Sequence, residues 1–400
     1  MRTIAILCGG GPAPGINTVV ATVTKVFLKD GFRVLAIHEG YKGLFAVHPE
    51  VEELTYEKAD QIYSRGGSAI KMSRFKPEDQ DFTTALFVKE GIELLVTIGG
   101  DDTASTANRL TKYLAAHQVN IHVPKTIDNA LPLPEGIPTF GFTSAKEMGV
   151  TIGKVIKAEA STTQNWYLLM SMGREAGHLA FEIGKGIHAS MIIIPEMFNK
   201  TQITIDKIVR LIISSMIKRR IVGQKFGVVV VGEGIFHFLQ DEDIASSGIT
   251  FDYDAHGHPE LSEVSKAHVI SKILKNRLKE LNLDIICRPV EVGYSLRCVD
   301  PSAFDLTYCT TLGIGVKKLY DEGHSGCMVA VNLEEEVIPV YLKDVEDEHG
   351  KIRTRLVNID KEVVRQTLAE NIYYLTAQDR SLARKWLADP EPFEYERILG

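Results

Sequence analysis

The chain has 400 residues, of which 44% are hydrophobic and 24% are charged, and its formal net charge is −7. This length and apolar content suit about two globular domains, whereas the acidic balance argues against a nucleic-acid partner. The N-terminal apolar run, Ile4 to Leu7, is too short for a signal peptide, and no apolar run reaches the ~20 residues of a membrane span, so we expect no membrane partner.

The chain opens with a strand, a glycine-rich loop and a helix. We expect a strand at 3–8, a loop at 9–15, a helix at 16–29 and a second strand at 32–37. The glycines would let a ligand approach the backbone, and the helix would offer its N-terminal amides to a phosphate. A dinucleotide site with Glu39 as the ribose acid fits less well, because G-x-G-x-x-G read from Gly9 meets Pro14 at its third glycine. A plain tight turn is the remaining alternative.

A basic, glycine-containing segment follows at residues 63–76. Its cationic side chains, Arg65, Lys71 and Arg74, could bind a polyanion, or the segment could be a solvated surface loop. Both interpretations stay open at this point.

Two polar loops follow consecutive predicted strands. The apolar run 94–98 ends in Gly-Gly-Asp-Asp and the run 121–123 ends in Pro-Lys-Thr-Ile-Asp-Asn, with a helix expected between them at 103–117. Parallel strands end at one edge of a sheet, where ligands bind, so we expect four charged residues to converge there: Asp101, Asp102, Lys125 and Asp128. Oxygen ligands of this kind hold Mg²⁺ to substrate phosphates. Either loop alone could be a turn or a cap, but the two together favour such a site.

A proline- and glycine-rich segment at residues 131–142 is typical of a rigid domain boundary. Strands and helices then alternate again. Strands are expected at 166–171, 191–194, 226–231 and 285–292, and helices at 143–160, 203–219, 262–281 and 302–321. The strand-end loops 172–174 and 232–234 would again face a shared cleft. Two short β runs, 327–331 and 336–341, precede a charged tail, 361–400, that we interpret as a helical packing arm.

Cysteine and histidine side chains are weaker candidates for a metal site. The cysteines are an odd number without a C-x-x-C pair, which indicates reduced thiols in a cytoplasmic protein and no zinc site: Cys8, Cys287, Cys298, Cys309 and Cys327. His256 and His258 could ligate a metal as an i, i+2 pair, but no third ligand is suitably spaced, and a surface loop is the favoured interpretation.

Six motifs occur in order between residues 9 and 297: GGGPAPG, TIGGDD, PKTIDN, MGREAGH, GEG and RPVEVGYSLR. Together they resemble the motifs of the phosphofructokinases, in particular those of the pyrophosphate-dependent bacterial branch. GGD alone is weak, because NAD kinases and lipid kinases share it, whereas PKTIDN together with MGRE is highly specific.

The resemblance implies a fold and an activity. The fold would be α/β, with two Rossmann-like three-layer domains, mostly parallel sheets and the active site in the cleft between them. Residues 1–139 and about 296–345 would form the donor domain, 140–295 the sugar-phosphate domain and 346–400 a C-terminal helical arm. The enzyme would reversibly transfer a phosphoryl group from pyrophosphate to the 1-hydroxyl of fructose 6-phosphate, with Mg²⁺ as cofactor, in cytoplasmic glycolysis or gluconeogenesis.

The resemblance also implies roles on the donor side. Asp101 would hold Mg²⁺, Gly10 would contact the donor phosphate, and Asp128 would be the general base for the sugar 1-hydroxyl. ATP-using relatives typically carry Gly at the position of Asp102 and often at that of Lys125. A carboxylate at Asp102 would repel the α-phosphate of ATP by about 4 kcal/mol, taking unit charges ~4 Å apart at a dielectric of ~20. We therefore expect Asp102 to exclude ATP and Lys125 to orient the leaving phosphate.

Further residues would bind the sugar phosphate. Thr126 and the backbone of three consecutive residues would contact fructose 6-phosphate: Thr126, Ile127 and Asp128. The sugar and the moving phosphoryl group would be lined by Met172, Gly173 and Arg174, and Glu233 would bind sugar hydroxyls. The 6-phosphate would be bound by Tyr294, Ser295, Leu296 and Arg297. Arg288 would reach into a neighbouring subunit's site, which implies a homodimer or homotetramer.

Two departures from the family pattern affect catalytic strength or sugar identity. The family usually has Asp where this chain has Ala130, and Arg where it has Asn165. Two alternatives to a pyrophosphate-dependent enzyme follow, namely an ATP-dependent 6-phosphofructokinase or related sugar-phosphate kinase, and a weakly active regulatory homologue. Four retained residues argue against the weakly active homologue: Asp101, Asp128, Arg174 and Glu233.

Overall fold

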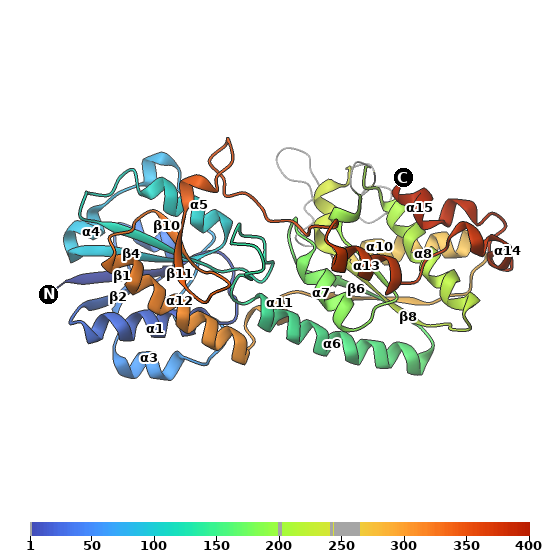
Figure 1. Cartoon of the computed structure of the whole chain (residues 1–400), viewed down its shortest axis with the longest axis horizontal. Helices are drawn as coiled ribbons and strands as arrows, with labels where there is room; N and C mark the ends of the chain where they lie inside the picture. The colour runs from blue at the N-terminus through green and yellow to red at the C-terminus, as the bar shows by residue number, and fades with distance from the viewer. Residues whose placement is uncertain (1, 199–201, 241–242, 244–264) are drawn as a thin grey trace. The chain divides into compact units, whose positions relative to one another are not determined.

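The structure is a computed structural model that describes residues 2–198, 202–240, 243 and 265–400. It consists of two compact units (Figure 1). Unit 1 comprises Met1–Ala145 and Tyr294–Arg355, and unit 2 comprises Lys146–Gly293 and Leu356–Gly400. The segment 346–400, expected to be an arm of its own, is thus shared between the units. The pair His256 and His258 lies outside the described residues.

Unit 1 contains a seven-stranded sheet in the order β11-β10-β5-β4-β1-β2-β3. Its strands are β1 (Thr3–Cys8), β2 (Arg33–Ile37), β3 (Val51–Glu53), β4 (Ile92–Gly99), β5 (Val119–Pro124), β10 (Cys327–Val331) and β11 (Val337–Tyr341). The inner strands pair in parallel, whereas the edge strands β3 and β11 pair antiparallel with their neighbours. Strands β1 and β4 are apolar along almost their whole length because helices and loops bury both faces of the inner sheet.

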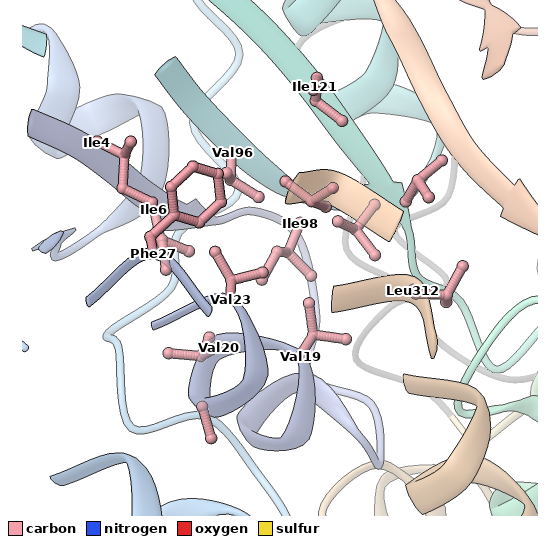
Figure 2. Packing of buried hydrophobic residues seen from close by; sticks show 14 of the residues in the cluster. Ile4, Ile6, Val19, Val20, Val23, Phe27, Val96, Ile98, Ile121 and Leu312 are labelled. Carbon is pink, nitrogen blue, oxygen red and sulfur yellow. The ribbon is translucent and has the colours of Figure 1, made fainter. Parts of the chain in front are cut away.

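The core on one face of this sheet lies under α1 (Ile16–Lys29) and α12 (Ala303–Asp321). Val19, Val20, Val23 and Phe27 recur along α1 at helical spacing and are fully buried. Figure 2 shows these side chains gathered with those of β1, β4 and β5, and with Leu312 of α12. Removing a buried aromatic such as Phe27 would cost about 3–5 kcal/mol, so this cluster fixes the strands whose ends carry the loops described below.

The predicted helix 103–117 is shorter and begins earlier than expected, because α5 spans Asp101–Leu110. Asp101 and Asp102 are therefore its first two residues rather than loop residues, a placement that the helix dipole favours for acidic side chains. The helix ends where the Thr111 hydroxyl donates to the Asn108 carbonyl, a local bond that competes with helix continuation. Smaller elements complete unit 1: α2 (Gly40–Leu44), α3 (Tyr56–Ile62), α4 (Ala85–Glu90) and α11 (Tyr294–Arg297).

Unit 2 contains a four-stranded parallel sheet in the order β7-β8-β6-β9. Its strands are β6 (Trp166–Ser171), β7 (Met191–Ile193), β8 (Gly227–Gly232) and β9 (Cys287–Val292). The longer helices are α6 (Phe142–Thr163), which begins in unit 1, α7 (His178–Gly186), α8 (Ile205–Ile221) and α10 (Lys266–Glu280). These elements agree with the predicted ones to within a few residues. The central strands β6 and β8 are fully buried, whereas the edge strand β9 is largely exposed.

The C-terminal residues of unit 2 form three short helices, α13 (Glu362–Glu370), α14 (Arg380–Ala383) and α15 (Tyr395–Leu399). They are joined to α8 by polar contacts, since Lys218 Nζ lies 2.7 Å from Asp379 Oδ1 and Ser214 Oγ accepts a 2.8 Å bond from the Leu375 amide. The five cysteines are free thiols. Among the described residues, no helix has the length and apolar character to cross a bilayer.

Candidate active site

The glycine-rich loop of unit 1 leaves β1 and is held by neighbouring backbone. The Gly9 amide donates to Ile98 O and the Gly10 amide to Ser73 O, both at 2.9 Å. Gly10 has φ +79°, a left-handed conformation that favours glycine. Ser73 belongs to the basic segment 63–76, so this segment and the glycine loop are neighbours.

Lys125 connects this loop to the end of β5. Its side chain is buried, and Nζ donates to the Gly11 carbonyl at 2.6 Å. Arg297 reaches the same loop, because a Cβ built on Gly11 would lie 3.2 Å from Arg297 Nη1. The guanidinium also stacks on the Tyr294 ring at 5.0 Å. The sequence assigned Lys125 to the leaving phosphate and Arg297 to the sugar 6-phosphate, and the structure brings both cations to Gly11.

Asp101 and Asp102 start α5 immediately after β4. Asp102 forms an ion pair with Lys76, with Nζ 2.9 Å from Oδ1, and the two side chains are 70% (Lys76) and 45% (Asp102) exposed. Such a surface pair contributes about 0–1 kcal/mol, so it exchanges easily with a ligand. Lys76 lies in the basic segment but was not among the predicted residues, because lysine in a charged loop is no specific signal.

A buried histidine supports the backbone just before Asp101. His122 on β5 faces Thr97 on β4, with Nδ1 2.9 Å from the Thr97 hydroxyl and Nε2 3.0 Å from the Gly99 carbonyl. A carbonyl only accepts, so Nε2 carries the proton. Burial keeps the ring neutral, and Nδ1 therefore accepts from the Thr97 hydroxyl. Burial lowers the pKa of His122 to about 3; the bond to Gly99 opposes this shift and the nearby Lys125 reinforces it. The sequence analysis did not identify this pair.

The loop after β5 carries Thr126, Ile127 and Asp128. The Asp128 amide donates to Thr126 Oγ1 at 3.1 Å, and the Thr139 hydroxyl donates to Thr126 O at 2.7 Å. Ile127 and the Asp128 residue are largely buried, at 4% and 8% exposure. The loop therefore has a defined conformation that presents Asp128 at the carboxyl end of the sheet.

In unit 2, Glu233 organises the loop that follows β6. Its Oε1 accepts the Gly173 and Arg174 amides at 3.1 and 3.0 Å, and its Oε2 lies 3.2 Å from Lys266 Nζ. Burial raises the pKa of Glu233, but Lys266 and the two amides outweigh it, so the pKa lies below its usual value. Arg174 has φ +48°, and this strained turn is held by the carboxylate. Lys266 was not predicted, because no motif surrounds it.

Neighbouring residues of this loop lie beside β9. The Met172 amide donates to Val292 O at 3.0 Å, and a Cβ on Gly293 would lie 3.0 Å from Met172 Cε. Arg288 is exposed on the edge strand β9, in register with Tyr167 of β6. Ser295 and Leu296 follow in α11, where Leu296 is buried and Ser295 is exposed.

Unit 2 also contains a pocket of about 470 Å³ that the sequence did not suggest. Most of its lining residues are apolar, and residues 356–360 form part of the lining. One of its carboxylates, Glu196, has a pKa raised by burial, although backbone amides oppose the shift. Glu196 Oε1 accepts the Gly177 and Val357 amides at 2.9 and 3.0 Å. None of the predicted site residues lines this pocket.

The metal ligand expected from the resemblance is a single carboxylate, that of Asp101. Among the described residues, no group of three or more His, Cys, Asp or Glu side chains could hold a metal ion. Mg²⁺ usually keeps several waters and takes one or two carboxylates plus substrate phosphates. Asp101, at the start of α5 beside the glycine loop, suits that one-carboxylate arrangement.

Comparisons with known proteins match this chain to phosphofructokinases over most of its length. The phosphofructokinase family profile matches residues 3–320. The pyrophosphate--fructose 6-phosphate 1-phosphotransferase of Thermotoga maritima is 35% identical, covering 97% of this chain and 93% of the relative. The enzyme of the same name from Naegleria fowleri is 37% identical over 90% of this chain and 85% of its own.

Solved structures share the fold. Crystal structures of pyrophosphate-dependent phosphofructokinases from Marinobacter aquaeolei and Nitrosospira multiformis superpose with TM-scores of 0.70 and 0.71. Each covers 97% of this chain, and this chain covers 92% and 91% of them, at 18% and 17% identity. The α/β fold predicted from the sequence is thereby confirmed.

Proposed function

This chain belongs to the phosphofructokinase family, and on that premise we propose that it transfers a phosphoryl group from pyrophosphate to fructose 6-phosphate. The products are fructose 1,6-bisphosphate and phosphate, and the reaction is reversible. The observation that carries the proposal is the similarity, over 97% and 90% of the chain, to two enzymes named for this reaction. The free thiols, one of them the exposed Cys298, suit a reducing compartment such as the cytoplasm.

Donor choice rests on Asp102 and Lys125. Asp102 lies at the start of α5, where its charge would oppose the α-phosphate of ATP, whereas pyrophosphate has no third phosphate to repel. Lys125 lies beside Gly11, close enough to the glycine loop to accompany the leaving phosphate. The Gly10 backbone supplies the close approach that a phosphate needs.

The chemical step needs a base and charge neutralisation. Asp128 takes the proton from the 1-hydroxyl as that oxygen bonds to phosphorus and the bridging P–O bond of pyrophosphate breaks. Mg²⁺, when bound through Asp101, supplies charge neutralisation on the phosphates. Lys125 and Arg174 supply the remaining positive charge, because phosphoryl transfer is largely positioning plus electrostatic stabilisation.

Sugar binding falls to unit 2 and to the residues after β9. Glu233 is oriented by two backbone amides and Lys266, and a carboxylate has acceptor sites left for sugar hydroxyls. Met172, Gly173 and Arg174 line the sugar. The 6-phosphate is bound by Tyr294, Ser295, Leu296 and Arg297, and by Arg288 of a second subunit. The exposed position of Arg288 on an edge strand suits a homodimer or homotetramer.

A donor assay tests the function. Purified protein with Mg²⁺ and fructose 6-phosphate should form fructose 1,6-bisphosphate faster with pyrophosphate than with ATP, and sedoheptulose 7-phosphate tests the choice of sugar. A higher rate with ATP would overturn the donor assignment. Asp128→Asn should lower kcat by about 10²–10⁴-fold, the usual range for a lost base, with little change in either KM. An unchanged kcat would remove Asp128 from the mechanism.

A further inference from the structure

Arg355 lies outside the residues that match the phosphofructokinase profile, yet it binds the loop that carries Asp128. Its Nε donates to Asn129 O at 3.1 Å and its Nη1 to Ile137 O at 2.8 Å. Its Nη2 binds Asn129 Oδ1, and its own amide donates to Ala130 O at 2.7 Å. One side chain thus connects both ends of the segment 129–137.

The residue next to Asp128 depends on these contacts for its conformation. Asn129 has φ +57°, in the left-handed region that non-glycine residues rarely occupy. Its side-chain oxygen also accepts the Thr139 amide at 3.0 Å. The Thr139 hydroxyl in turn donates to Thr126 O, two residues before Asp128. The network therefore grips the backbone on both sides of the base.

The position of Arg355 is costly for a guanidinium. The side chain is half-buried, and burial lowers the pKa of Arg355, an effect that Tyr308 partly opposes. Planar, forked donors suit several carbonyls at once, which lysine cannot imitate. Apolar packing could not take its place, because the carbonyls of Asn129 and Ile137 need hydrogen-bond donors.

We propose that Arg355 is a positioning residue that holds Asp128 in its reactive orientation. The inference rests on the proposed function, in which Asp128 is the base. Misplacement of a base by about 1 Å costs on the order of 10²-fold in rate, so the effect belongs mainly in kcat, and the KM for pyrophosphate, to which residues 126–128 are not assigned, should stay unchanged.

The test uses the full-length protein and a matched pair of variants. Arg355→Met keeps an unbranched, apolar stem but removes the donors, and kcat should fall about 10- to 100-fold, with the KM for pyrophosphate changed by less than about threefold. Arg353→Met is the control, because Arg353 donates to Asp344 O and Val345 O and does not touch the Asp128 loop. It should keep wild-type kcat. Hydrogen exchange over residues 126–139 should quicken only in Arg355→Met.

A double-mutant cycle separates positioning from general damage. In an Asp128→Asn background, Arg355→Met should change the residual kcat by less than about twofold, because the two residues act through one group. An equal fall in kcat with Asp128 present and with Asp128→Asn, or a wild-type kcat in Arg355→Met, would overturn the inference. If Arg355→Met does not fold, Arg355→Lys replaces it, and a wild-type kcat in that variant would be equally decisive against positioning.

The same measurements distinguish failure of the proposed function. If the wild type transfers no phosphoryl group from pyrophosphate, the proposed function is wrong and this inference falls with it. If the wild type is active, Asp128→Asn is not, and Arg355→Met equals the wild type, only the role of Arg355 is wrong.

Discussion

Asp102 is the residue that we expect to exclude ATP by charge repulsion. It is the second residue of α5 and pairs with Lys76 across a half-exposed surface. The pair leaves the carboxylate accessible, and screening by solvent reduces its repulsion of ATP below the value for a buried charge. The effect on donor choice should therefore be large but incomplete.

Replacing Asp102 by Gly should admit ATP and weaken pyrophosphate use. The ratio of kcat/KM for ATP to that for pyrophosphate should rise between about tenfold and a thousandfold, the upper limit corresponding to about 4 kcal/mol. Initial rates with each donor measure this ratio. Lys76→Met is the companion variant. It removes the cation that pairs with Asp102 but keeps the carboxylate, so the ratio of kcat/KM for ATP to that for pyrophosphate should not rise. An unaltered ratio in Asp102→Gly would exclude Asp102 as the selecting residue.

The neutral His122 makes stability depend on pH. Unfolded histidine has a pKa near 6.5, and the folded pKa is about 3, so between these values the unfolded state binds more protons and acid favours unfolding. The contribution of His122 to the free energy of unfolding falls by about 2 kcal/mol between pH 7 and pH 5. It is regained as the pH rises above the unfolded pKa.

His122→Gln keeps a donor for Gly99 O but has nothing to titrate. The difference in the free energy of unfolding between wild type and variant should therefore narrow by about 2 kcal/mol from pH 7 to pH 5. Denaturant titrations followed by circular dichroism at each pH measure it. A difference that does not change with pH would show that the pKa of His122 is the same in the folded and the unfolded protein.

At the scale of elements, the carboxylate of Glu196 connects two segments of unit 2 that are far apart in the sequence. Glu196, in the 3₁₀ turn Pro195–Phe198, joins the start of α7 to Val357, where the chain re-enters unit 2. Two backbone amides share its Oε1. Strand–helix alternation does not encode this bond, because its partners are distant in sequence.

Glu196→Ala should destabilise unit 2 by about 1–3 kcal/mol, because it leaves two amides without their acceptor. Glu196→Gln keeps Oε1 and should lie close to the wild type. Both tryptophans, Trp166 and Trp386, belong to unit 2, so tryptophan fluorescence during denaturation reports on this unit. Equal stability of the Ala and Gln variants would show that the bonds from the Gly177 and Val357 amides to Glu196 Oε1 do not stabilise unit 2.

At the scale of the whole molecule, the four-stranded sheet ends in an exposed edge. Ile286 is 54% exposed next to β9, and an open edge strand offers unpaired backbone groups to another chain. Arg288 on this strand serves the 6-phosphate only if a second subunit supplies the rest of the site. The proposed oligomer and the proposed role of Arg288 in the sugar site therefore depend on each other.

Light scattering at assay concentration should give at least a dimer. Arg288→Ala should raise the KM for fructose 6-phosphate about ten- to a hundredfold, since a charged hydrogen bond contributes about 1.5–3 kcal/mol, and should leave the KM for pyrophosphate unchanged. Dilution below the dissociation constant should lower specific activity. A fully active monomer would be incompatible with this role for Arg288.

Local patterns in the sequence determined most of the secondary structure and the fold class. Apolar runs that end in glycine-containing loops mark β1, β4, β6 and β8, because side-chain periodicity and turn chemistry depend on neighbouring residues. The same patterns located Asp101, Lys125 and Asp128 at strand ends. Two expectations were wrong: α5 starts at Asp101, where the helix dipole favours acidic side chains, and the segment 346–400 is shared between the two units, because its contacts divide between them.

Only the tertiary structure decided which distant groups meet. The bonds of Lys266 to Glu233, of His122 to Gly99 and of Arg355 to Asn129 join residues 33, 23 and 226 positions apart. No motif surrounds these donors, since a lysine, a histidine or an arginine gains its role from the acceptor that folding brings to it. Strands and loops follow from local sequence, whereas the groups that orient Asp128 and Glu233 follow from packing, because a hydrogen bond depends on distance in space and not on separation along the chain.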